Sequence, residues 1–257
     1  PRVPQAFVMH SAEFDVELPP QVAGLAGAVV VMNDRVEARA RAMALDAEIV
    51  RLRQPIDPLR FRARKHARDR PRTALLLGNA LAGPRRALIT GALDAAGIAW
   101  SQLGAAAGRM TYEPERSLAD ADIVIGYGRT VIEGMSCGCA GYVYDLSLDG
   151  WVTPERYAAI EADGFAGLAT GDVATPERLA ADLAAYSPEL GIASRELVTL
   201  HHDPFRHANA IAGVLARLAP GRPAPQDADE LARLIRVQWQ RERAALHTAR
   251  GQHDQIE

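Results

Sequence analysis

The sequence predicts an α/β protein built on a doubly wound, mainly parallel sheet. Short apolar runs alternate with segments of helical pattern along the chain, as in parallel sheets covered by helices. The run at residues 123–125 (Ile-Val-Ile) contains no polar residue, which is typical of a strand buried on both faces. The glycine turn at 126–128 follows it, and then a helix that opens at Arg129 and ends at Gly138. Strand, tight turn and helix in this order form the repeating unit of such sheets.

Composition supports a globular protein and argues against several other classes. The 257 residues are 48% hydrophobic and 24% charged, which allows a full core. The net charge of −3 gives no reason to expect a nucleic-acid partner. No apolar run approaches the ~18–20 residues of a membrane span. With two cysteines and no leader-like start, we expect a cytoplasmic protein, either free or peripheral to the inner membrane face. The chain starts with Pro1, so we expect a fragment or a processed product.

Residues 1–58 are expected to be the end of a first α/β domain. Strands are expected at 6–9, 27–32 and 49–52, and a helix at 35–43 with Asn33 or Asp34 as its N-cap. A basic linker follows at 59–72, which is either a solvated helix or a contact for an anionic lipid or acceptor. Its basic residues are Arg62, Arg64, Lys65, His66, Arg68, Arg70 and Arg72.

Residues 73–218 are expected to form a complete second domain. The buried strand 73–77 ends at Gly78 and Asn79, at the edge where open α/β sheets present their binding loops. The further elements expected are a helix at 84–96, a strand from 98, a strand or loop at 110–112, a helix at 117–120, a strand at 142–144, helices opening at Thr153 and Thr175, and a helix from Asp203 to Leu218.

Residues 219–257 are expected to hold a C-terminal helix and tail. The helix, from 227 to about 248, is charged and amphipathic, with Leu234, Ile235 and Trp239 among its apolar residues. It could pack back on the first domain or mediate a homo-oligomer. Residues 251–257 are expected to be disordered.

The glycine turn and the helix after it predict a binding site for an anion. Gly126 and Gly128 permit a sharp turn and a close approach to a ligand. The N–H groups and dipole of a helix start attract negative charge, and Arg129 lies at the same turn. Glu133, one turn further, could accept hydrogen bonds from vicinal hydroxyls such as those of a ribose. Together these features indicate a nucleotide-sugar pocket.

The segment 128–138, Gly-Arg-Thr-Val-Ile-Glu-Gly-Met-Ser-Cys-Gly, resembles the donor-binding motif of GT-B glycosyltransferases. The signature of their retaining group, G-x-x-x-x-E-A-M-A-x-G, places Glu133, Met135 and Gly138 in register. The resemblance implies a Rossmann-like donor domain preceded by the end of an acceptor domain. It also implies a nucleoside-diphosphate sugar as donor, a glycan, lipid or small molecule as acceptor, and no metal or cofactor. The retaining group carries another Glu where this chain has Ile125, so retention or inversion stays open.

The same resemblance implies roles for individual residues. His10 matches a histidine near the donor sugar and is the catalytic candidate. The residues expected at the nucleotide are Gly78, Asn79, Arg85, Gly128, Arg129, Thr130 and Glu133. Arg85 would offset diphosphate charge, although a solvated helix face explains it as well. Glu133 is expected at the ribose, and Arg129 with Thr130 at the diphosphate.

Two other functions remain open at this point: a non-catalytic nucleotide-sugar-binding module or partner subunit, and a UDP-sugar 2-epimerase of similar fold.

Asp145 and Asp149 lie in an expected loop after the strand at 142–144, either as site residues or as plain turn residues. We interpret His201, His202 and His207 as surface histidines of a capped helix, and not as metal ligands.

Overall fold

The computed structural model describes residues 3–12, 14, 17–19, 24–63, 68–145, 147–221 and 228–253. Contacts divide the chain into two compact units, residues 1–52 with 210–257, and residues 53–209. The basic linker expected at 59–72 falls within the second unit, and its residues 64–67 lie outside the described residues. Each unit is described by itself.

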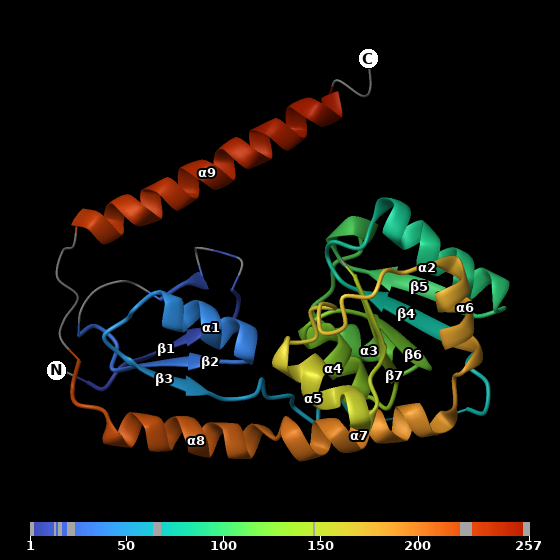
Figure 1. The fold of residues 1–257 in the computed structure, drawn as a ribbon, viewed down its shortest axis with the longest axis horizontal. Helices are drawn as coiled ribbons and strands as arrows, with labels where there is room; N and C mark the ends of the chain where they lie inside the picture. Colours follow the sequence, from blue (N-terminus) through green and yellow to red (C-terminus); the bar gives the residue numbers. More distant parts are fainter. Residues whose placement is uncertain are drawn as a thin grey trace. The chain divides into compact units, whose positions relative to one another are not determined.

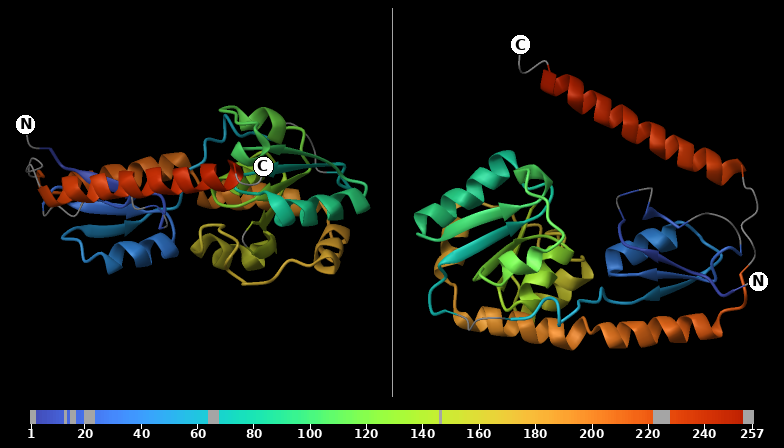
Figure 2. Two further views of the ribbon diagram at one scale, coloured as in Figure 1. Left: turned by 90° about the horizontal axis from the view of Figure 1, so that it is seen from above. Right: turned by 180° about the vertical axis from the view of Figure 1, so that it is seen from behind.

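The first unit contains a three-stranded parallel sheet with one helix on its face (Figures 1 and 2). Its elements are β1 (Ala6–Met9), β2 (Ala28–Val31), β3 (Glu48–Arg51) and α1 (Asp34–Ala42), with strand order β1-β2-β3. The apolar β2 is the central strand and is fully buried. The Asn33 side chain accepts a 2.9 Å hydrogen bond from the Val36 N–H, which confirms Asn33 as the N-cap.

The end of the chain is also assigned to the first unit. Helix α8 (Pro204–Arg217) brings Arg217 to Glu48, with 2.6 Å between Nη2 and Oε1. Helix α9 (Ala228–His253) continues through 251–253, where the sequence predicted disorder; residues 254–257 lie outside the described part of the chain. No helix in the described ranges is both long and apolar enough to cross a membrane.

The second unit contains a five-stranded sheet in the order β5-β4-β6-β7-β8. Its strands are β4 (Thr73–Leu77), β5 (Ala99–Leu103), β6 (Ile123–Gly126), β7 (Ala140–Tyr144) and β8 (Leu148–Trp151). The first four are parallel, which confirms the predicted α/β fold. The expected loop at 145–151 was wrong, because β8 returns antiparallel to β7 and is fully buried. A tight reversal after Asp145 makes this possible, with the Asp145 N–H donating to the Ser147 carbonyl at 3.2 Å.

Helices cover both faces of the second sheet (Figure 1). On one face lie α2 (Gly83–Ala95) and α6 (Pro176–Ala184); on the other lie α3 (Pro114–Leu118), α4 (Arg129–Ser136), α5 (Pro154–Ala162) and α7 (Pro188–His201). Thr175 caps α6 as predicted, accepting from the Arg178 N–H. Thr153 makes no such cap because its hydroxyl bonds Glu155 instead. The sequence analysis missed α7, although Ser187 and Pro188 carry the same start signal.

The order of strands creates a switch point between β4 and β6. From β4 the chain passes through α2 to β5 on one side, and then returns through α3 to β6 on the other side. The carboxyl ends of β4 and β6, at Leu77 and Gly126, are paired neighbours. Ligands of open α/β sheets bind in the crevice outside such a reversal. The fold therefore predicts a ligand site at the loops after these two strands.

The sequence predicted surface histidines near the end of α7, but His202 is buried and has a packing role. The buried His202 contacts the Gln54 carbonyl through Nδ1 (2.7 Å) and the Tyr157 hydroxyl through Nε2 (2.9 Å). His207 contacts the Arg53 carbonyl through Nδ1 at 2.9 Å. These imidazoles therefore fix residues 53–54 against the helices of the second unit.

Burial of His202 predicts a loss of stability in weak acid. Desolvation by burial lowers the pKa of His202 to about 4, whereas an unfolded histidine titrates near 6.5. Between these values the unfolded chain binds a proton that the folded chain does not, so the free energy of unfolding falls as the pH falls. The loss through this group is at most about 1.4 kcal/mol per pH unit. Urea unfolding at pH 7 and pH 5 should show a smaller difference for His202→Gln than for the parent; equal differences would contradict this.

Candidate functional site

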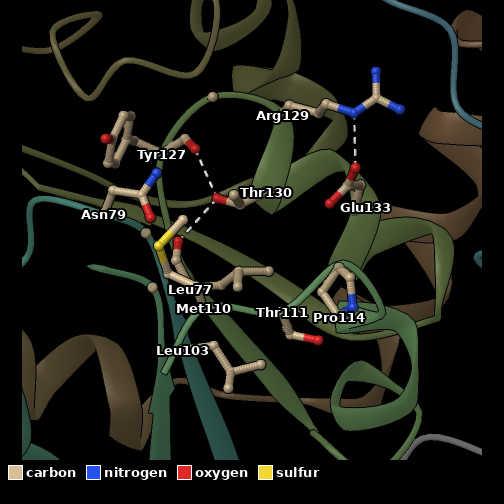
Figure 3. A pocket seen from close by; sticks show the side chains of 13 residues that line it. Leu77, Asn79, Leu103, Met110, Thr111, Pro114, Tyr127, Arg129, Thr130 and Glu133 are labelled. Carbon is tan, nitrogen blue, oxygen red and sulfur yellow. Dashed lines mark hydrogen bonds and ion pairs between the residues drawn. The ribbon is translucent and has the colours of Figure 1, made fainter. Parts of the chain in front are cut away.

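A cavity of about 360 Å³ lies at the switch point of the second sheet (Figure 3). It is lined by residues at the carboxyl ends of β4, β5 and β6, by the loop before α3, and by the first turns of α4. Six of the residues singled out from the sequence line it together: Gly78, Asn79, Gly128, Arg129, Thr130 and Glu133. Residues separated by some fifty positions in the chain thus meet at one edge of the sheet.

The loops after β4 and β5 approach each other too closely for a side chain. A Cβ on Gly104 would lie 2.1 Å from the Gly78 carbonyl oxygen, and Gly104 has a φ of +129°. Asn79 fastens the same two loops, because its Oδ1 accepts from the Ala105 N–H at 3.1 Å and its carbonyl from the Ala106 N–H at 3.2 Å. Asn79 therefore shapes this wall of the cavity.

Helix α4 begins at the cavity with a sharp glycine turn. Gly128 has a φ of +61°, and its N–H donates to the Phe165 carbonyl at 2.7 Å. The Thr130 hydroxyl lies 2.7 Å from the Tyr127 carbonyl and 3.0 Å from the Leu77 carbonyl (Figure 3). Its single proton is thus used within the protein, so an anion here would meet mainly backbone N–H groups at the start of the helix.

Arg129 and Glu133 form an ion pair at the cavity wall, with 2.7 Å between Nε and Oε1 (Figure 3). The Glu133 residue is 9% exposed, whereas the Arg129 side chain is 45% exposed and extends toward the Pro55 carbonyl. Burial raises the pKa of Glu133, and the Arg129 guanidinium partly opposes that shift. The two residues that the sequence assigned to ribose and diphosphate therefore contact each other in this structure.

The Arg129 guanidinium is expected to hold the pKa of Glu133 below the value that burial alone would give it. Replacing Arg129 by leucine removes the largest influence that lowers the Glu133 pKa and leaves the burial that raises it. The pKa of Glu133 should therefore be higher in Arg129→Leu than in the parent. A carboxyl-carbon NMR titration of both proteins measures it; an unchanged or lower value would contradict the pairing.

Two residues singled out from the sequence are not among those that line this cavity. Arg85, in the first turn of α2, lines a different cavity and pairs with Asp145, with 2.9 Å between Nη1 and Oδ1. His10 follows β1 in the first unit and is exposed. Ile125, where the resembling retaining enzymes carry a second Glu, is buried in the sheet core. Position 125 therefore belongs to the core packing.

Other lining residues were missed by the sequence analysis. Tyr127 lies between the two glycines of the turn, and its ring is beside Asn79 in Figure 3. Leu103 ends β5 and Gly104 follows it, and their position at a strand's carboxyl end was the available signal. Met110 and Thr111 come from the loop before α3, and Pro114 is the first residue of α3; no local pattern assigns them to the cavity.

Asp149, which the sequence placed in a loop after the strand at 142–144, lies in a strand and bonds within the protein. Asp149 is fully buried in β8, and its Oδ1 accepts from the Thr170 N–H at 2.9 Å. Within the described ranges, no group of three or more His, Cys, Asp or Glu side chains is placed to hold a metal ion. The chemistry of the cavity itself comes from backbone N–H groups, one guanidinium and one buried carboxylate.

Comparisons with known proteins found structural similarity only. No family model matches the chain, and no curated protein matches it. Among solved structures, it is similar to sucrose-phosphate synthase from Thermosynechococcus elongatus, at 14% identity and a TM-score of 0.42, over 76% of this chain and 59% of that one. It is also similar to CalG4, the calicheamicin glycosyltransferase, at 22% identity and a TM-score of 0.37, over 76% and 54%. The chain spans less than two thirds of either protein.

Proposed function

We propose that the chain is the donor-binding part of a glycosyltransferase, of the hexosyltransferase type, that uses a nucleoside-diphosphate sugar. The observation that carries the proposal is the cavity at the β4–β6 switch point, where the start of α4 and the buried Glu133 carboxylate face one space. The helix start suits a diphosphate, and a carboxylate one turn along suits the hydroxyls of a ribose.

The ion pair suggests how the donor would be received. Arg129 has a half-exposed, flexible side chain, and a diphosphate at the start of α4 would compete with Glu133 for its guanidinium. Release of the pair would free Oε1 of Glu133 for a ribose hydroxyl. Arg129 and the helix dipole would then stabilise the charge that develops on the leaving diphosphate. The sugar itself would pass through an oxocarbenium-like transition state.

Release of nucleoside diphosphate from UDP-, GDP- and ADP-sugars tests the proposal, with and without a panel of sugar, glycan and lipid acceptors. Acceptor-dependent release with a glycosylated product supports glycosyl transfer. Conversion of the donor to its 2-epimer without an acceptor would instead identify an epimerase. Binding of a donor with neither reaction would assign the chain to a non-catalytic module or partner subunit. The buried Ile125, which stands where the resembling retaining enzymes carry a second Glu, would suit that function.

A further inference from the structure

A second cavity, of about 260 Å³, opens at the carboxyl end of β7 and shares no lining residue with the first. It lies between the first turn of α2, the residues after β7, and the segment before α6. Because β7 is parallel to β4 and β6, the cavity is at the same edge of the sheet, where such folds carry their ligand sites. The proposed glycosyl transfer does not use it.

A fixed donor and acceptor pair forms one wall of this cavity. Arg85 Nη1 lies 2.9 Å from Asp145 Oδ1, and the Asp145 side chain is 6% exposed while that of Arg85 is 37% exposed. The Tyr144 hydroxyl donates to the Arg85 carbonyl at 2.9 Å, which holds the start of α2 against the end of β7. A ligand here meets a guanidinium and a carboxylate side by side, both already oriented.

The Ser147 hydroxyl also lines the cavity. Its Oγ is buried and has no hydrogen-bond partner among the residues that the structure describes. An unpaired buried hydroxyl is destabilising, so native structures seldom leave one without a partner. Because Oγ is out of contact with solvent, a ligand hydroxyl in the cavity would pair with it once the Ser147 side chain turns toward the cavity.

The charge, lining and volume of the cavity restrict the chemical class of ligand that it can bind. Its lining contains one cation, Arg85, and two carboxylates, Asp145 and Asp172. Asp172 also pairs with Arg178, with 3.2 Å between Oδ2 and Nη1, so the charges are balanced and favour a neutral ligand. Leu88 and the exposed Val173 add apolar surface. The volume is below the 300–1,000 Å³ of drug-sized sites, so the ligand is small. Adjacent hydroxyls could donate to Asp145 and accept from Arg85 while C–H groups pack on the apolar wall.

We propose that this cavity is a second ligand site, which binds a neutral sugar or polyol of monosaccharide size. Saturation-transfer NMR with the methyl α-glycosides of glucose, galactose and mannose tests it. Transfer to at least one glycoside is expected, and it should persist in Glu133→Ala and with UDP, GDP and ADP present. This proposal and the proposed function can therefore fail separately. No transfer to any of the three, or a signal lost in Glu133→Ala, would overturn the second site.

Two variants locate the binding within the cavity. Val173→Trp fills its rim from a side chain that is 80% exposed, so the core is undisturbed. Ser147→Ala removes a hydroxyl that bonds no described residue. Each should weaken glycoside binding at least fivefold, whereas Leu59→Trp, at an 83% exposed position outside the cavity, should not. Unchanged affinity in both cavity variants would overturn the assignment.

Discussion

The Glu133→Ala variant should bind nucleoside diphosphate about 10- to 100-fold more weakly than the parent, because hydrogen bonds to a charged group contribute about 1.5–3 kcal/mol. In the proposed complex the lost bonds run from the ribose hydroxyls to the buried carboxylate at the wall of the first cavity. Glu133→Gln should lose less, because an amide oxygen still accepts a hydrogen bond but carries no charge. Calorimetric titration of the three proteins measures the differences.

The matched control is Glu177→Ala. Glu177 is also acidic and lies near the start of a helix, α6, but it is exposed and does not line the cavity. Its removal should leave the affinity unchanged. Equal affinity in Glu133→Ala and Glu177→Ala would show that Glu133 does not contact the nucleotide. Circular dichroism of each variant confirms that the fold is retained.

The Gly104→Ala variant should lose both stability and nucleotide binding. Its Cβ would lie 2.1 Å from the Gly78 carbonyl oxygen, which belongs to the backbone and cannot turn aside. The positive φ of +129° adds strain for any residue with a side chain. Overpacking and backbone strain together are expected to cost about 3 kcal/mol or more. Relief of the clash would separate the loops after β4 and β5, which line the cavity. Urea unfolding and the same calorimetric titration measure the two effects.

Gly108 provides the comparison that isolates the clash. It also has a positive φ, +63°, but a Cβ there would meet nothing within 4 Å. Gly108→Ala should therefore show only backbone strain, about 1–2 kcal/mol, and normal nucleotide affinity. If Gly104→Ala were no less stable than Gly108→Ala, the close approach of the two loops would be wrong.

Local patterns predicted the second sheet well. An unbroken apolar run gave β6, and the glycine turn with a polar helix start gave α4, because each depends on neighbouring residues alone. The same patterns missed β8, since Asp149 and Gly150 read as turn residues. The burial of β8 comes from its pairing with β7 and from Thr170, which is distant in sequence and whose N–H donates to Oδ1 of Asp149. Tertiary contacts decided that segment.

The site was predictable in its residues but not in their pairing. The glycine turn and Glu133 could be placed at one cavity because parallel strands end at the same edge. The spacing of four along a helix also predicts that Arg129 contacts Glu133. The sequence analysis instead placed Arg129 at the diphosphate, because of the resemblance to the donor-binding motif. Arg85, which the sequence placed near the nucleotide, lines a different cavity, because the first turn of α2 meets the end of β7. No local pattern encodes that contact.

The central claim is that the cavity at the β4–β6 switch point binds a nucleoside diphosphate. Calorimetric titration of the chain with UDP, GDP and ADP tests it most directly. The account predicts binding of one nucleotide per chain, with a preference for one of the three and loss of affinity in Glu133→Ala. No heat of binding with any of the three nucleotides would contradict it.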